Sequence, residues 1–206
     1  MTAATAPARP ALLGALPLLA VLAVSGLSPD TALAAPLTYT LDPAHSWVQF
    51  ELLHFGTSTI RGRLGPLQGS VTLDPQAGSG ELGLRLATAT LSTGLRVFDA
   101  RIRQDDLLGS GTWPEAYFVA SRFRYEQGQL AEVRGEFTLR GVGQPLSLKA
   151  VRYSCRVPAA PEAQDATEVC GGDFEGEFKR SDFGITYGLP FVGDRVRLTV
   201  QVEGRR

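Results

Sequence analysis

The sequence contains few of the side chains on which metal, redox and acid–base chemistry depend. Its 206 residues include only two histidines, two cysteines and one methionine. A metal site needs three or four clustered ligands, and Asp42, His45 and His54 form only a weak candidate set. No G-x-S-x-G, H-E-x-x-H or phosphate-cradling glycine loop is present. We therefore predict no catalytic residues, no metal site and no cofactor.

An excess of one charge is also missing. The 20 Lys and Arg residues nearly balance the 21 Asp and Glu residues, which leaves a net charge of −1. A protein that binds nucleic acid, or an anionic membrane through its overall charge, needs a basic surplus. The composition therefore gives no indication of either partner.

Long hydrophobic runs are absent except at the N-terminus, where Ala11–Val24 is almost continuously apolar. Arg9 precedes the run, and Ala32-Leu33-Ala34 follows as an A-x-A cleavage site. A retained anchor is the alternative, but the run is shorter than the roughly 20 residues that a spanning helix needs. We predict a cleaved signal peptide at 1–34, a single domain at 35–206, and a periplasmic or secreted protein.

Cys155 and Cys170 flank a segment rich in Pro, Ala and acidic residues. Export would place them in an oxidising compartment, which favours a structural disulfide. Free thiols or a redox pair are the alternatives, although no C-x-x-C spacing supports catalysis.

Most of the remaining sequence alternates between apolar and polar residues, which is typical of half-buried strands. Gly- or Pro-containing turns separate most of these runs. The predicted strands are 46–53, 68–73, 81–89, 117–125, 129–140, 146–154, 173–179 and 195–202.

One segment breaks this pattern: 95–108 lacks Gly and Pro and predicts a short helix. The fold class is thus all-β with about eight antiparallel strands. Strands with one apolar face must bury it in a two-sheet sandwich or a closed barrel, and the pattern alone does not choose between them. A barrel of about eight strands either fills itself with side chains or holds one small ligand.

The stretch from Tyr39 to Leu73 combines two alternating runs with polar residues between them. We expect a short loop there that carries His54, Gly56, Ser58, Arg61 and Gly62. A histidine and an arginine at a strand end could meet a polar group while the strands enclose something apolar.

Five segments, in this order, resemble the YceI-like family over nearly the whole predicted domain. They are YTLDPAHSWVQFELLHFG, STIRGRLGPLQGSVTLDP, STGLRVFDARIRQDDLL, GEFTLRGVGQPLSL and FKRSDFGITYGLPFVGDRVRLTVQVE. The resemblance implies an extended, lipocalin-like antiparallel β-barrel with a helix near one end. It further implies export to the periplasm, a polyisoprenoid or isoprenoid quinone held inside, and a link to stress responses.

Several polar positions match the family pattern and others depart from it. His54 and Gly56 match a histidine–hydrophobic–glycine step, Arg61 an arginine–glycine, and Asp99 the acid of the helix. Arg101 replaces a histidine that often follows that acid, and the aromatic-rich run expected next is altered to 107–114. The matches at 140–142 and 181–184 are interpreted as a hairpin turn and a structural motif.

The candidate ligand-binding residues fall into a polar and an apolar group. His54 could contact a head group or be a satisfied buried histidine, and Arg61 could pair with a phosphate or with a carboxylate such as Asp99. Ordinary surface pairing is the alternative for Asp99 and Arg101. The predicted apolar wall consists of Phe50, Leu84, Leu86, Phe123, Phe137 and Leu198.

Three functions are compatible with these features. The favoured one is an exported binding protein, not an enzyme, for an isoprenoid lipid or quinone, with transient membrane contact and edge strands that would permit a homodimer. A barrel filled by its own side chains would instead serve a structural or interaction role. An enzyme acting on a lipid or quinone would need His54 and Asp99 within reach of one reactive atom.

Overall fold

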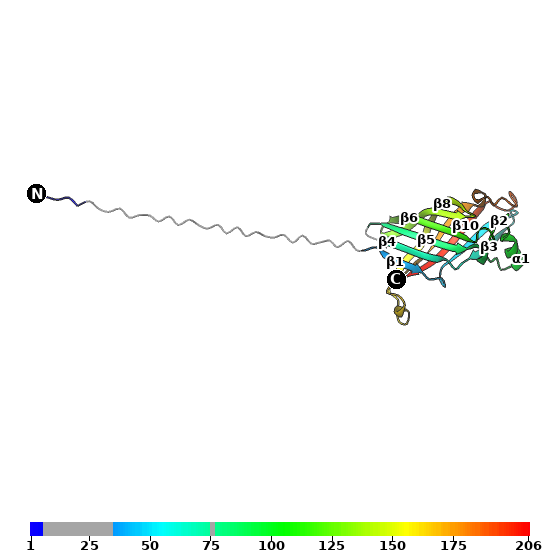
Figure 1. Cartoon of the computed structure of the whole chain (residues 1–206), viewed down its shortest axis with the longest axis horizontal. Helices are drawn as coiled ribbons and strands as arrows, with labels where there is room; N and C mark the ends of the chain where they lie inside the picture. Colours follow the sequence, from blue (N-terminus) through cyan, green and yellow to red (C-terminus); the bar gives the residue numbers. More distant parts are fainter. Residues whose placement is uncertain (6–34, 75–76) are drawn as a thin grey trace. The chain divides into compact units, whose positions relative to one another are not determined.

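The computed structural model describes residues 1–5, 35–74 and 77–206 (Figure 1). The chain divides into two units, Met1–Ala32 and Leu33–Arg206. In the first unit only residues 1–5 are described, and they form no helix or strand. The predicted signal peptide thus lies almost entirely outside the described residues and stays a prediction.

The second unit is a single antiparallel sheet that closes on itself. Its strand order is β1-β4-β5-β6-β7-β8-β9-β10-β2-β3, and β1 also pairs with β10. The strands are β1 (Leu37–Leu41), β2 (Trp47–His54), β3 (Ser58–Leu64), β4 (Gln68–Asp74), β5 (Ser79–Ala87), β6 (Glu115–Glu126), β7 (Gln129–Leu139), β8 (Val142–Arg156), β9 (Val169–Lys179) and β10 (Arg195–Arg205).

The eight strands β1 and β4 to β10 form the closed ring, which confirms the predicted barrel. Strand β10 has a different neighbour at each end: Gly204 pairs with Leu41 of β1, whereas Val200 pairs with Val48 of β2. The β2–β3 hairpin therefore extends the wall at one end of the barrel only. Helix α1 (Arg96–Ile102) lies at that same end, opposite the C terminus (Figure 1).

The alternation in the sequence matches the alternation of side chains that face the barrel interior and side chains that face the solvent. On β10, Val196, Leu198 and Val200 are buried, whereas Arg195 and Arg197 are exposed. All eight predicted strands are present, with ends shifted by a few residues. The described residues contain no helix with the length and hydrophobicity needed to span a membrane.

Two strands were not predicted, and one of them corrects an expectation. Ser58, Arg61 and Gly62 lie in β3, not in a loop. Gly62 conceals the alternation because it occupies an inward position without a side chain. A Cβ there would lie 2.6 Å from the ring of Phe50, so the glycine makes room for that ring. Strand β1 has only five residues, too few for a clear period.

The helix is shorter than the predicted 95–108, because α1 ends at Ile102. The residues after it form turns, in which the Leu108 N–H donates to the Ile102 carbonyl at 2.9 Å. The Ser110 N–H likewise donates to the Arg103 carbonyl at 3.0 Å, so the carbonyls of Ile102 and Arg103 do not bind the amides four residues further on, as they would in a continuing helix. The Arg140 guanidinium donates to the carbonyls of Asp105 and Leu107 and holds these turns in place. The described part of the chain also contains three short 3₁₀ turns: η1 (Thr88–Thr90), η2 (Glu162–Gln164) and η3 (Arg180–Phe183).

The predicted disulfide is present. Cys155 of β8 and Cys170 of β9 are direct register partners with Cα atoms 4.0 Å apart. The bond closes the excursion between these strands, which contains η2. It stabilises by restricting the unfolded chain.

Aromatic side chains pack inside the barrel end that contains the disulfide, and we call it the closed end. Inward-facing glycines make room for these rings. A Cβ on Gly80 would lie 3.0 Å from the ring of Phe123, and one on Gly172 would lie 3.2 Å from the ring of Phe174. Phe174 belongs to the main hydrophobic core cluster of the barrel, and Phe123, Tyr125 and Tyr153 pack against that cluster. These four aromatic residues, Phe123, Tyr125, Tyr153 and Phe174, are called the floor.

Candidate ligand-binding site

The other half of the barrel encloses a cavity of about 760 Å³, a size usual for small-molecule sites. The inward faces of β2 and of β5 to β10 form most of its wall, and Ile60 and Leu64 of β3 add to it. Phe98 and Ile102 of α1 cover one side. We call this half the open end.

Most of the predicted apolar wall lines this cavity. Phe50, Leu84, Leu86, Phe137 and Leu198 are among its lining residues. The ring centroid of Phe137 lies 5.4 Å from those of both Phe178 and Phe183. Phe123 is placed differently, because it belongs to the floor below the cavity.

His54 lies at the last position of β2 and lines the cavity. Its imidazole contacts the edge of the neighbouring Phe55 ring, with centroids 4.7 Å apart. The backbone of His54 also forms a bridge to Val192 in the loop before β10. The histidine therefore joins the β2–β3 hairpin to that loop at the open end.

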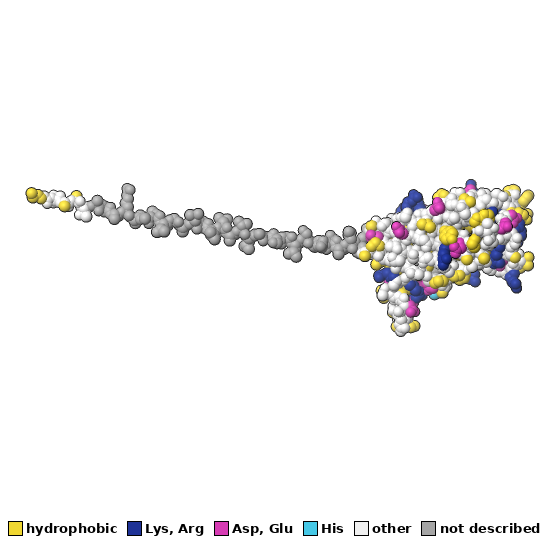
Figure 2. All heavy atoms as spheres, in the orientation of Figure 1, with side chains coloured by type: hydrophobic (Ala, Val, Ile, Leu, Met, Phe, Trp, Pro, Cys, Tyr) yellow, Lys and Arg dark blue, Asp and Glu magenta, His cyan; other side chains and the backbone are white. Residues whose placement is uncertain are grey.

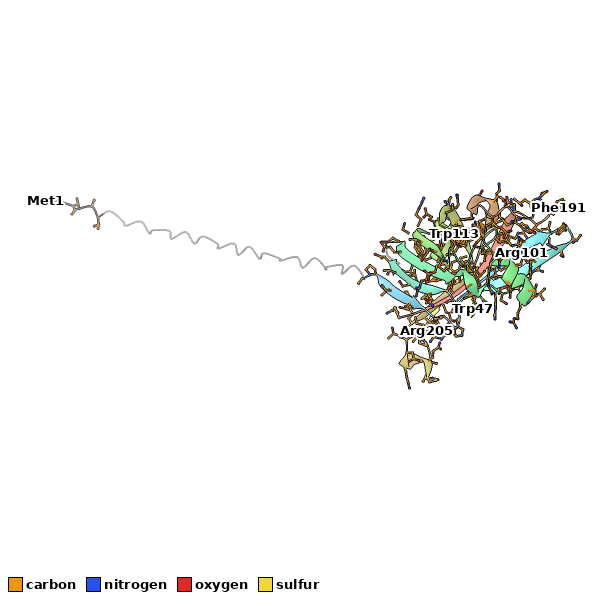
Figure 3. All side chains as sticks on the ribbon, turned by 45° about the vertical axis from the view of Figure 1, so that its right-hand side comes forward. Met1, Trp47, Arg101, Trp113, Phe191 and Arg205 are labelled. Carbon is orange, nitrogen blue, oxygen red and sulfur yellow. A yellow bond between two sulfur atoms is a disulfide. The ribbon has the colours of Figure 1, made fainter. Side chains whose placement is uncertain are left out.

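Arg101 also lines the cavity and is held by two partners. Its guanidinium donates two hydrogen bonds to the Asp106 carboxylate, at 2.7 and 2.6 Å, and its Cζ lies 4.2 Å from the ring centroid of Tyr187. Hydrogen bonds to Asp106 and Tyr187 raise the pKa of the Arg101 guanidinium. The side chain is thus a fixed cation at the open end (Figure 3).

The other two polar candidates do not line the cavity. The Arg61 side chain is 70% exposed, and its Nε donates to Glu51 at 3.1 Å. Asp99 is buried, and one carboxylate oxygen accepts hydrogen bonds from the Thr93 amide at 2.7 Å and the Thr93 hydroxyl at 2.6 Å. These bonds lower the pKa of the Asp99 carboxyl. Asp99 fixes the turn that leads into α1.

Arg180 lines the cavity and was not identified from the sequence. Its guanidinium is buried and donates to the carbonyls of Ile185, Tyr187, Val192 and Gly193, at 2.8 to 3.0 Å. Burial lowers the pKa of this guanidinium. The four bonds hold the cavity-lining loop before β10 in place. A basic residue directly before Ser181-Asp182-Phe183-Gly184 was the available signal.

Exposed apolar side chains surround the open end. The rings of Phe55 and Phe191 stack with centroids 5.7 Å apart, although they are 58% and 64% exposed. Hydrophobic side chains reach the surface there beside Lys and Arg side chains (Figure 2). We define the apolar rim as Leu53, Phe55, Leu95, Val97, Tyr187 and Phe191.

Two groups of close potential metal ligands occur among the described residues, and neither lines the cavity. One contains the two disulfide sulfurs, which are no longer thiolates. The other is Asp42, His45 and Glu203, so Glu203 takes the place that the sequence suggested for His54. The Arg205 guanidinium already lies 2.8 Å from the Asp42 carboxylate.

The comparison with protein families decides the relationship. The sequence model for the YceI-like domain matches residues 39–204. The chain belongs to this family. Both the family resemblance and the barrel inferred from it are therefore confirmed.

Relatives of this YceI-like domain are known in several bacteria. A UPF0312 protein of Pseudomonas paraeruginosa is 29% identical over 178 residues, which cover 85% of this chain and 89% of that protein. Protein YceI of Salmonella arizonae is 26% identical over 175 residues, which cover 84% and 88% of the two chains.

Solved structures share the fold at lower identity. BcnA of Burkholderia cenocepacia superposes with a TM-score of 0.65 and 19% identity, covering 79% of this chain and 98% of that chain. A polyisoprenoid binding domain of Saccharophagus degradans, implicated in plant cell wall breakdown, has a TM-score of 0.54 and 16% identity, covering 81% and 97%. At these identities the similarity shows the fold alone.

Proposed function

We propose that this YceI-like protein binds a long apolar ligand, a polyisoprenoid or an isoprenoid quinone, inside the open end of its barrel. The hydrocarbon chain lies in the cavity and the polar end lies near Arg101 and His54. The observation that carries the proposal is the 760 Å³ cavity with its almost continuous apolar wall.

Burial of the chain supplies the affinity. Removing apolar surface from water is favourable by about 25 cal/mol per Å². Part of this gain is offset by ordering the flexible ligand. Few polar contacts are therefore needed, which agrees with a site whose strands contribute mainly Leu, Val and Phe.

The charged side chains on the cavity wall favour a ligand whose polar end accepts hydrogen bonds. Among the described residues, the lining includes Arg85, Arg101 and Arg180 but no Asp or Glu. Arg85 and Arg101 have carboxylate partners nearby, whereas Arg180 has backbone carbonyls. The Arg85 side chain is exposed beside Glu115, and the Arg180 guanidinium is already satisfied, so Arg101 is the cation that a ligand in the cavity can reach. A phosphate, carboxylate or quinone carbonyl fits this donor.

Two further observations support the ligand class and the compartment. One solved structure with this fold is a polyisoprenoid binding domain. The predicted signal peptide and the disulfide agree with an exported protein in the periplasm or outside the cell. Carriage, storage or protection under stress are the roles that such a protein would serve.

The two alternative functions have less support. A barrel filled by its own side chains would not leave a cavity of this size. An enzyme based on His54 and Asp99 needs both groups at one reactive atom, but Asp99 accepts its hydrogen bonds from Thr93 away from the cavity wall. We therefore favour binding over catalysis.

Loading would take place at a membrane through the apolar rim, because the rim surrounds the entrance to the cavity. A patch of exposed aromatic and aliphatic side chains is typical of a surface that contacts lipid or protein. A homodimer through an unpaired edge stays a prediction. Strand β3 ends the sheet order and is bridged at Arg63 to Ser92.

The test is to purify the protein from its native host, extract its bound lipids with organic solvent and identify them by mass spectrometry. We expect a prenyl lipid at close to one molecule per protein. A protein that carries no lipid, and that also takes up no prenyl alcohol or quinone from vesicles, would contradict the proposal.

A further inference from the structure

Helix α1 turns the charge of Arg101 toward the cavity. Phe98, Arg101 and Ile102 are spaced so that their side chains lie on one face of the helix, and all three line the cavity. The Arg101 side chain is 35% exposed, so it lies where the apolar wall meets the solvent. It is therefore the charged group that the polar end of a bound ligand meets.

The Asp106 carboxylate neutralises this cation from outside the cavity. It accepts one hydrogen bond from each terminal nitrogen of the Arg101 guanidinium, at 2.7 and 2.6 Å, and its side chain is 49% exposed. Asp106 does not line the cavity. The hydrogen bonds between the two groups lower the pKa of the Asp106 carboxyl and raise the pKa of the Arg101 guanidinium, so both stay charged.

The Arg101 guanidinium still has donors for a ligand. A guanidinium carries five N–H groups, and the contact with Asp106 uses two of them. The ring of Tyr187, whose centroid lies 4.2 Å from the Arg101 Cζ, fixes the plane of the guanidinium. A ligand oxygen can therefore accept a hydrogen bond from Arg101 while Asp106 stays in place.

The rest of the cavity wall offers no cation to hold an anion. Arg85 lies 3.5 Å from Glu115, whereas the buried Arg180 donates to four backbone carbonyls. An anion that enters the cavity gives up hydration. It is attracted by Arg101 but repelled by Asp106, and two like charges about 6 Å apart at a protein surface change binding by about tenfold or more. An uncharged oxygen keeps the hydrogen bond and avoids both penalties.

We propose that Asp106 sets the head-group specificity of this barrel. Because it neutralises Arg101, the site prefers an uncharged oxygen acceptor, such as an amide, an alcohol or a quinone carbonyl, over a carboxylate or phosphate on the same chain. The inference rests on the proposed function and specifies the polar end of its ligand. Asp106 acts through Arg101 and does not itself touch the ligand, so it is a positioning residue.

The test compares two ligands that differ in charge but hardly in shape: a carboxylic acid with three isoprene units and its primary amide. At pH 8 the acid is ionised, because the pKa of a carboxyl group is about 4. Displacement of a fluorescent apolar probe measures the two affinities. For the full-length protein, processed as in its host, we expect the amide to bind at least tenfold more tightly than the acid.

Three variants assign the effect to the ion pair. Asp106→Asn should raise the affinity for the acid at least tenfold and leave the affinity for the amide within about threefold. Asp105→Asn is the matched control, since this exposed neighbour is not the ion-pair partner of Arg101. The double variant Asp106→Asn/Arg101→Gln should lose the gain, because the gain depends on the freed guanidinium. Asp106→Ser replaces Asp106→Asn if thermal unfolding shows that the latter does not fold.

The outcomes separate the two proposals. The head-group specificity would be overturned if the unaltered protein bound the acid as tightly as the amide. It would also be overturned by an unchanged ratio of the two affinities in the folded Asp106 variant, by an equal shift in Asp105→Asn, or by a gain that persists without Arg101. Each of these results leaves apolar binding intact. A folded protein that binds neither the acid nor the amide would overturn both proposals.

Discussion

The two ends of the barrel are made from the same alternating strands but have opposite interiors. At the closed end, Gly80 makes room for the Phe123 ring of the neighbouring strand β6, and Gly172 makes room for the Phe174 ring of its own strand, so aromatic rings occupy much of the interior. At the open end, the inward residues are mainly Leu, Val and Phe on a wall extended by β2 and β3, and a cavity remains. The difference indicates that the choice of side chain at inward positions, and not the strand pattern, decides where the barrel is hollow.

The two ends also differ in their covering. The closed end has β1 against β10 and the Cys155–Cys170 bond. The open end has α1 and the loop held by Arg180, which are joined by single side-chain contacts such as Arg101 with Tyr187. We infer that the closed end contributes most to the stability of the barrel and that the ligand enters and leaves at the open end.

The largest expected effect comes from placing a charge on the wall of the open end. Phe137→Asp should lower the affinity for prenyl alcohols by more than about 100-fold, because an unpaired buried carboxylate costs about 3 kcal/mol or more. Displacement of a fluorescent apolar probe measures the affinity. Val119→Asp on β6 is the matched control, since Val119 is 61% exposed. Equal loss in both variants would show that the cavity is not the binding site.

The next effect concerns the closed end. Replacing Cys155 and Cys170 by serine should cost about 3 kcal/mol of unfolding free energy for a closed loop of 15 residues. For a domain of this size the melting temperature should fall by roughly 6–12 °C. Calorimetry measures the fall, and prenyl alcohol binding at 20 °C should stay within about twofold. Loss of binding in the folded variant would contradict the separation of the two ends.

The apolar rim gives a smaller effect. The double variant Phe55→Ser/Phe191→Ser should slow lipid uptake from vesicles by about tenfold, since it removes two rings that can enter a bilayer surface. Stopped-flow fluorescence measures the rate, and Val119→Ser/Val151→Ser, at two exposed positions of the barrel wall, is the control. An unchanged rate would exclude the rim as the route of loading.

The sequence predicted the closed end and the open end unequally well. Strand positions, the disulfide and most of the apolar wall follow from a period of two, from cysteine spacing and from the family resemblance. Strand β3 was missed because Gly62 interrupts its pattern. The end of α1 was misplaced because the turns that follow it are held by Arg140, which lies in the distant turn between β7 and β8. No local pattern encodes such contacts.

The polar residues at the open end show the same limit. Family positions suggested Arg61 and Asp99, but a residue's position on a strand or turn does not determine which neighbour will bind it. Arg61 donates a hydrogen bond to Glu51 on the outer face, and Asp99 accepts a hydrogen bond from the Thr93 amide. Arg180 was overlooked because four backbone carbonyls satisfy it, and these come together only in the folded loop.

The smallest expected effect concerns the acid stability of the barrel wall at Glu132. Glu132 of β7 faces away from the barrel interior, and hydrogen bonds from Arg134, Ser147 and Arg124 lower its pKa to about 2. The pKa in the folded protein lies below the unfolded value of about 4.3. Its stabilising contribution is thus complete above about pH 4.3 and is lost as the pH falls toward 2.

Glu132→Gln should be less stable than the parent at pH 6 but lose less stability between pH 4.5 and 2.5, as measured by urea unfolding. Binding of prenyl alcohols at pH 6 should be equal in both, because Glu132 does not line the cavity. Parallel pH profiles for the two proteins would contradict the assignment of this acid sensitivity to Glu132.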